Sequence, residues 1–122
     1  MICFENNREY VLRPADFAPF EGSILPLLEE EEQVLLTCQA AGNGMVFTNR
    51  RVIAVDVQGM LGTQSDVCSL FFRSVQGFAS DRADGFSTLE LFLAGHKQVR
   101  FRFDYADADL TPVTTAISRF TL

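Results

Sequence analysis

The chain has 122 residues, of which 48% are hydrophobic and 21% are charged, and these fractions are typical of one globular domain with a single core. The net charge of −6 and the single lysine, Lys97, disfavour nonspecific binding to nucleic acid or anionic lipid, because both need clustered basic residues. No apolar run approaches the roughly 18 residues of a membrane span, and no stretch resembles a signal peptide. We therefore expect a cytoplasmic protein without a membrane span.

The acidic residues are concentrated near the start of the sequence. Residues 1–33 hold eight acids and two bases, whereas residues 34–103 hold five acids and seven bases. We expect residues 1–19 to form an N-terminal extension, in which residues 9–13 are a short strand or an ordered arm. A short helix is predicted at 20–30. The glutamates Glu29 to Glu32 oppose the helix macrodipole there, so we interpret them as a solvated helix exit.

From residue 33 the sequence changes to short apolar segments separated by turn residues. The Gly-Asn-Gly stretch at 42–44 and the Asp-Gly pair at 84–85 supply the positive φ angles that tight hairpin turns need. Around Gly95, apolar residues occupy every second position on both sides, which indicates an antiparallel hairpin with one buried face. We predict about seven antiparallel strands, at 34–40, 45–48, 52–57, 63–71, 75–80, 89–93 and 99–103.

The end of the chain changes to helical periodicity. Apolar residues at spacings of three, four and three predict a helix from about 109 to 120. Asp109 or Thr111 can cap its N-terminus. We take 20–122 as one mainly β domain that this helix closes. The residues predicted for its core are Leu35, Val46, Ile53, Val55, Leu89, Leu91, Leu93, Phe101, Phe103, Val113, Ile117 and Phe120.

No catalytic or metal-binding pattern is found. The cysteines Cys3, Cys38 and Cys68 lack metal-knuckle spacing, and the only histidine, His96, lies in a predicted turn. We expect Cys38 and Cys68 to be buried structural thiols, with a disulfide or a reactive thiol as the alternative. Without a nucleophile, a base and an orienting group in register, we predict neither an enzyme nor a cofactor.

A family resemblance arises in the middle of the chain. The segment 47–53 reads Phe-Thr-Asn-Arg-Arg-Val-Ile, and an aspartate and a Gln-Gly turn follow it. This stretch resembles the bacterial PH-domain family, and the segment 70–75 and the last hairpin are similar to their counterparts there. The resemblance covers roughly residues 20–120 and implies a pleckstrin-homology-like, partly open barrel with a C-terminal helix and a short N-terminal helix or arm.

The resemblance has two departures, and it implies a fold more firmly than a function. Thr63 and Gln64 stand where family members often carry a lysine pair, and Phe71 stands where they often have proline. Known structures of the family include ring-like oligomers, while its bacterial members are largely uncharacterised.

The phenylalanine content suggests an interaction surface. The chain has twelve phenylalanines and no tryptophan. Phe71 and Phe72 are adjacent, so strand alternation should send one to the core and the other outward, and Phe92 should point away from the buried leucines beside it. We predict a non-catalytic module that associates with itself or another protein through these residues. Packing beneath the terminal helix or the N-terminal arm is the alternative.

Weak binding of an anionic headgroup or phospholipid is the second hypothesis. Arg50, Arg51 and Arg73 could supply the contacts, but the first predicted hairpin, 38–44, carries no base. The simpler interpretation makes Arg50 and Arg51 turn residues, one solvated and one paired with an acid such as Asp56. The Arg-Phe-Arg-Phe stretch at 100–103 is not a nucleic-acid platform, because alternation sends its phenylalanines to the core.

Overall fold

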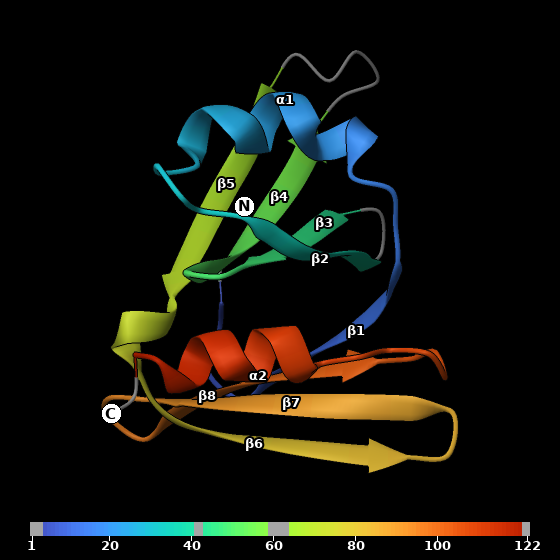
Figure 1. The fold of residues 1–122 in the computed structure, drawn as a ribbon, viewed down its shortest axis with the longest axis vertical. Helices are drawn as coiled ribbons and strands as arrows, with labels where there is room; N and C mark the ends of the chain where they lie inside the picture. Colours follow the sequence, from blue (N-terminus) through green and yellow to red (C-terminus); the bar gives the residue numbers. More distant parts are fainter. Residues whose placement is uncertain (1–3, 41–42, 59–63, 121–122) are drawn as a thin grey trace.

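One curled sheet of eight strands forms most of the protein (Figure 1). The computed structural model describes residues 4–40, 43–58 and 64–120. The strand order across the sheet is β5-β4-β3-β2-β1-β8-β7-β6. The strands are β1 (Arg8–Pro14), β2 (Val34–Ala40), β3 (Asn43–Thr48), β4 (Arg51–Gln58), β5 (Gln64–Phe71), β6 (Val75–Ala83), β7 (Phe86–Leu93) and β8 (Lys97–Phe103). The mainly β, partly open architecture is confirmed, with eight strands instead of about seven.

The additional strand, β1, joins the two halves of the sheet. It pairs in parallel with β8, from Arg8 opposite Val99 to Leu12 opposite Phe103. Near its end it pairs antiparallel with β2, where Arg13 lies opposite Gln39. Residues 8–14 therefore lie at the centre of the sheet. The segment predicted as an N-terminal extension, 1–19, therefore contributes a strand to the sheet.

The main core lies inside the curled sheet, beneath the C-terminal helix α2 (Thr111–Ser118) (Figure 1). The ring centroid of Phe47 lies 5.3 Å from that of Phe101 and 5.5 Å from that of Phe103. All three rings are fully buried, so the strand alternation predicted for 99–103 is confirmed.

Helix α2 buries the predicted face, but the predicted cap is wrong. Val113 and Ile117 face the core, while the N-cap residue is Leu110 and no side chain caps the helix. Asp109 lies one residue earlier, and its Oδ1 accepts a hydrogen bond of 3.0 Å from the backbone N–H of Thr111. The core prediction is wrong for Phe120, which is 40% exposed because the helix ends at Ser118. Leu35 and Leu93 are only partly buried against the core.

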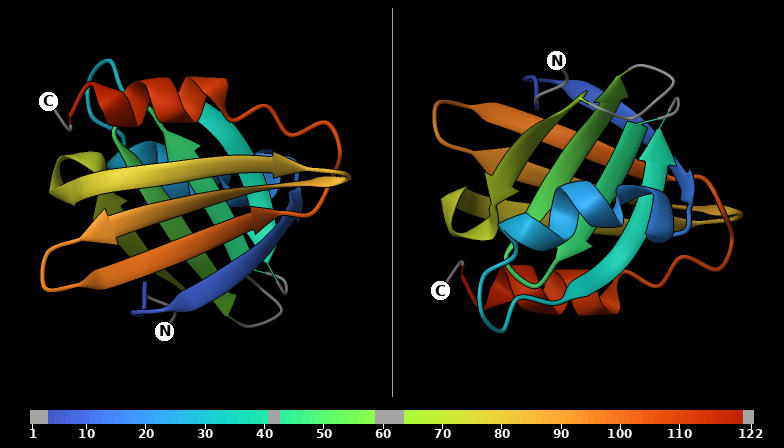
Figure 2. Two further views of the ribbon diagram at one scale, coloured as in Figure 1. Left: turned by 90° about the horizontal axis from the view of Figure 1, so that it is seen from below. Right: turned by 90° about the horizontal axis from the view of Figure 1, so that it is seen from above.

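A second, smaller core lies on the outer face of β3 and β4. The turns η1 (Ala18–Phe20) and η2 (Leu25–Leu27) flank the short helix α1 (Glu21–Ile24), and the three together cover that face (Figures 1 and 2). The buried residues of this small core are Phe20, Ile24, Val46, Ile53 and Val55. In place of the single helix predicted at 20–30, the structure has a four-residue α-helix between two 3-10 turns. By contrast, no helix of the described chain covers the outer face of β1, β8, β7 and β6 (Figure 2).

Two residues of the predicted first turn belong to a strand. Asn43 pairs with Ala40 and Gly44 pairs with Gln39, so both lie in the β2–β3 ladder. Residues 41–42 lie outside the described residues. Gly44 lies within β3, where an added Cβ would come within 2.8 Å of the Phe20 ring. Close packing against Phe20, and not turn geometry, therefore accounts for a glycine at position 44. The predicted turn at Asp84-Gly85 is confirmed, with Gly85 at φ +82°.

The cysteines differ from one another. Cys38 is a buried free thiol, and burial raises its pKa to about 11 although the Tyr105 hydroxyl lies 3.7 Å from its Sγ. Cys68 is disulfide-bonded, so the expectation of a free thiol is wrong there. Cys3 lies outside the described residues.

Within the described parts of the chain, none of the helices is both long and apolar enough to cross a membrane.

Candidate functional site

The turn between β3 and β4 is held by the hydroxyl of Thr48. This hydroxyl accepts hydrogen bonds of 3.0 Å from the backbone N–H groups of Arg50 and Arg51. Its own nearest acceptor is Glu32 Oε2, at 2.6 Å. One buried side chain thus fixes the reversal of the chain and ties it to the segment that precedes β2.

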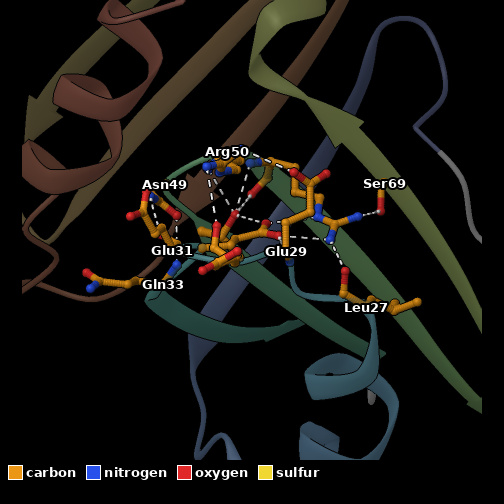
Figure 3. A network of polar contacts seen from close by, with 11 residues as sticks. Leu27, Glu29, Glu31, Gln33, Asn49, Arg50 and Ser69 are labelled. Carbon is orange, nitrogen blue, oxygen red and sulfur yellow. Dashed lines mark hydrogen bonds and ion pairs between the residues drawn. The ribbon is translucent and has the colours of Figure 1, made fainter.

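Asn49 ties the same turn to this segment from the outside (Figure 3). Its Oδ1 accepts a hydrogen bond of 2.8 Å from the backbone N–H of Gln33, and its Nδ2 donates one of 3.2 Å to the Glu31 carbonyl oxygen. Thr48 and Asn49 therefore connect the β3–β4 turn by hydrogen bonds to the segment 31–33, which precedes β2.

Arg51 forms a buried ion pair with Glu32. Its Nε lies 2.9 Å from Glu32 Oε2, and its Nη2 lies 2.9 Å from Oε1, so the pair is bidentate. Nη2 also donates to the Leu27 carbonyl oxygen at 2.6 Å, and Nη1 donates to Ser69 Oγ at 3.3 Å (Figure 3). The Arg51 and Glu32 side chains are 7% and 0% exposed. All three nitrogens of the guanidinium thus donate hydrogen bonds within the chain.

Glu32 is held as a carboxylate by these contacts. Burial alone would raise its pKa, but the hydrogen bonds from Arg51, from Thr48 and from the Glu29 backbone N–H lower the pKa below its usual range. The prediction of a solvated glutamate run is therefore wrong for Glu32. The two arginines of the turn pair with glutamates, Arg51 with Glu32 and Arg50 with Glu29, so the prediction of one solvated arginine and one paired with an acid such as Asp56 is wrong.

Of the three predicted anion contacts, the structure brings Arg50 and Arg73 together. They line a cavity of about 40 Å³ with Glu29, Phe71 and Phe120. Arg50 Nη1 forms an ion pair of 3.1 Å with Glu29, and the Arg73 guanidinium lies 5.0 Å from the centre of the Phe71 ring. Arg51 stacks on the same ring, also at 5.0 Å, while its charge is paired with Glu32.

The three predicted interface phenylalanines have different environments. Phe72 begins the 3-10 turn η3 (Phe72–Ser74) and is fully buried, so it belongs to the core and cannot contact a partner. Phe71 is partly buried between the two arginines. Phe92 is 36% exposed. Phe72 therefore lies in the core, Phe71 is partly buried, and Phe92 is the most exposed of the three.

Phe92 lies in an open groove beside an edge of the sheet. Within the described residues, β6 pairs only with β7, and the ladder shifts register between Val75 and Gly77. Gly77 lies opposite Phe92 and leaves room beside the ring. The groove has a volume of about 460 Å³ and is lined by Gln76, Phe92, Leu93, Gly95, His96, Lys97 and Gln98. Sequence alternation identified Phe92, whereas the groove depends on strand pairing that alternation does not encode.

Comparison with known proteins supports the fold. The family model described as bacterial PH domain matches residues 9–121. The uncharacterized protein YjqA of Bacillus subtilis (strain 168) is 26% identical over 107 residues, which cover 82% of this chain and 86% of that protein.

Two solved structures are similar to this chain in fold. A DUF1696 family protein with a pleckstrin-homology domain from Shewanella loihica PV-4 has a TM-score of 0.63 and 22% identity, and the match covers 93% of this chain and 99% of that one. A pleckstrin homology domain from Shewanella amazonensis SB2B has a TM-score of 0.54 and 23% identity, with 88% and 90% covered.

Proposed function

The chain belongs to the bacterial PH-domain family, and from this premise we propose that it is a non-catalytic interaction module that associates with copies of itself. The observation that carries the proposal is the exposed Phe92 ring in its groove beside the edge strand β6. An edge strand offers unpaired backbone N–H and C=O groups, and an adjacent aromatic ring adds apolar area to a contact there.

The charge around this groove favours a second copy as the partner. Lys97 and His96 lie at its rim, in a chain whose net charge is −6. The exposed glutamates Glu30 and Glu31 lie on a different part of the same chain. A second copy can therefore present acidic residues to Lys97, and such complementarity guides association.

Phe92→Asp should convert a multimer into a monomer, because the new carboxylate would lie in the apolar part of the contact. We would measure the mass by light scattering on a sizing column, over a range of concentration and salt. Val11→Asp is the matched control, since Val11 is also an exposed apolar residue, at 46%, but lies on β1. A wild-type chain that stays monomeric at high concentration, or a folded Phe92→Asp variant with wild-type mass, would refute the proposal.

Weak anionic headgroup binding is the second candidate, and it is favoured by Arg50 and Arg73 lining one cavity. Against it, Arg50 is paired with Glu29 and Arg51 with Glu32, so little uncommitted positive charge is available. We expect the chain to stay in the supernatant when it is sedimented with phosphatidylserine-containing vesicles at physiological ionic strength. Co-sedimentation that Arg50→Ala with Arg73→Ala abolishes would instead establish headgroup binding.

A further inference from the structure

A second cavity is lined by residues from the end of the β6–β7 hairpin and from the start of α2. Its volume is about 210 Å³. Most of its lining is polar, and the lining residues are Ser80, Asp81, Arg82, Ser87, Ala108, Asp109, Leu110, Thr111 and Thr114. The Phe92 groove described above shares none of these residues.

Strand alternation explains why polar side chains line this cavity. Leu89 is buried on the inner face of β7, and Ser87 lies two residues before it, on the same face. Ser87 pairs directly with Arg82 of β6, and Leu89 pairs with Ser80. The inner face of the hairpin thus changes from apolar to polar toward its tip, at the point where α2 begins.

Ser87 is a mostly buried residue whose hydroxyl opens into the cavity. It is 4% exposed and lines the cavity, and no hydrogen bond joins its hydroxyl to another of the described residues. No solvent-inaccessible side-chain oxygen of the described residues lacks a hydrogen-bond partner, so the Ser87 hydroxyl is reached from the cavity and is available to a ligand there. This observation is independent of the charges around the cavity.

Charges of both signs line the cavity. Arg82 is close enough to help lower the pKa of Asp109, although the hydrogen bond from the Thr111 backbone N–H contributes most. No ion pair of 4 Å or less joins Arg82 to Asp109 in the described structure. A simple anion would be repelled by Asp109, and a simple cation by Arg82. A ligand that carries both charges satisfies both side chains.

We propose that this cavity binds a small zwitterion of the α-amino-acid class, with its carboxylate toward Arg82 and Ser87 and its ammonium group toward Asp109. Ala108 and Leu110 supply the apolar part of the wall against a short side chain. This site would add small-molecule recognition to a module whose proposed contact with other copies lies elsewhere.

The test is an NMR titration of the full chain, labelled with ¹⁵N, with L-alanine, L-serine and L-leucine. We expect saturable shifts at residues 80–87 and 108–114 with at least one of them. Lactate lacks the ammonium group of alanine and ethylamine lacks its carboxylate, so each should bind at least about tenfold more weakly. The absence of saturable shifts with all three amino acids, or equal binding of lactate, would overturn the proposal.

Substitutions at the cavity test whether its side chains bind the ligand, and a substitution elsewhere on α2 serves as the control. Arg82→Gln and Asp109→Asn should each weaken binding by about tenfold or more, and asparagine keeps an oxygen that can accept the hydrogen bond from the Thr111 backbone N–H. Ser87→Ala should weaken it by a smaller factor. Ser118→Ala is the control, because Ser118 Oγ donates to the Thr114 carbonyl oxygen near the other end of α2, and binding should be unchanged. Unchanged affinity in both charge variants would contradict the assignment of this cavity.

Discussion

Replacing Arg51 with methionine should lower the free energy of unfolding by about 3–5 kcal/mol, because it leaves the Glu32 carboxylate buried without its counter-charge. The Glu32 side chain is 0% exposed, and both of its oxygens accept hydrogen bonds from Arg51. The methionine also removes the bonds to the Leu27 carbonyl oxygen and to Ser69. Urea denaturation, followed by circular dichroism, measures the loss.

Arg50→Met is the matched control for this effect. Arg50 is the preceding residue and also pairs with a glutamate, but its side chain is 35% exposed and that of Glu29 is 54% exposed. Exposed ion pairs contribute about 0–1 kcal/mol, so the control should lose little stability. If the free energy of unfolding fell equally in the two variants, the buried Arg51–Glu32 pair would contribute no more to stability than the exposed Arg50–Glu29 pair.

The same pair has a predictable pH dependence. Because the folded-state pKa of Glu32 is lowered, its contribution to stability is present above the unfolded-state pKa of glutamate and is lost as the pH falls through the folded-state pKa. In Arg51→Met, burial should instead raise the pKa of the Glu32 carboxyl group. Lowering the pH should then protonate this group and remove the cost of burying an unpaired charge. The stability difference between wild type and variant should therefore shrink below about pH 4. A difference that stays constant down to pH 3 would contradict this account.

For the β3–β4 turn, the sequence predicts the local structure but not the distant residue that pairs with it. The stretch 47–53 was sufficient to predict a turn, a following strand and the family. It did not indicate that Glu32 is the partner, because Thr48 and Arg51 lie 16 and 19 residues from Glu32 in the sequence. Periodicity identifies the face of an element, but it carries no information on which distant side chain will meet that face.

The central position of β1 was missed for a related reason. Only Tyr10 and Leu12 of its seven residues are buried, so the strand resembles an exposed arm in sequence. Its place in the sheet comes from parallel pairing with β8, about 90 residues further along the chain. Local patterns predicted β8 and the β7–β8 hairpin correctly because the contacts that stabilise a hairpin are close in sequence. The outward direction of Phe92 followed from the same short-range pattern.

Gly44→Ala should destabilise the protein by about 1–3 kcal/mol, as overpacking of a filled core does. The added Cβ would lie 2.8 Å from two ring carbons of Phe20 and 3.1 Å from its Cγ. Cγ is the root of the ring, so rotation of the ring cannot relieve the contact. Phe20 is itself 5% exposed and packed in the small outer core. The chain must then shift η1 away from β3, although alanine would otherwise suit a strand interior better than glycine.

Gly22→Ala is the matched control for Gly44→Ala. Gly22 lies in α1, and a Cβ there would meet nothing within 4 Å. Alanine should therefore stabilise the chain by up to about 1 kcal/mol, because it reduces the freedom of the unfolded state. Combining Gly44→Ala with Phe20→Leu should cost less than the sum of the two single changes, since the smaller side chain frees the space that the Cβ needs. Strictly additive losses, measured by urea denaturation, would show that position 44 requires glycine for a reason other than the Phe20 ring.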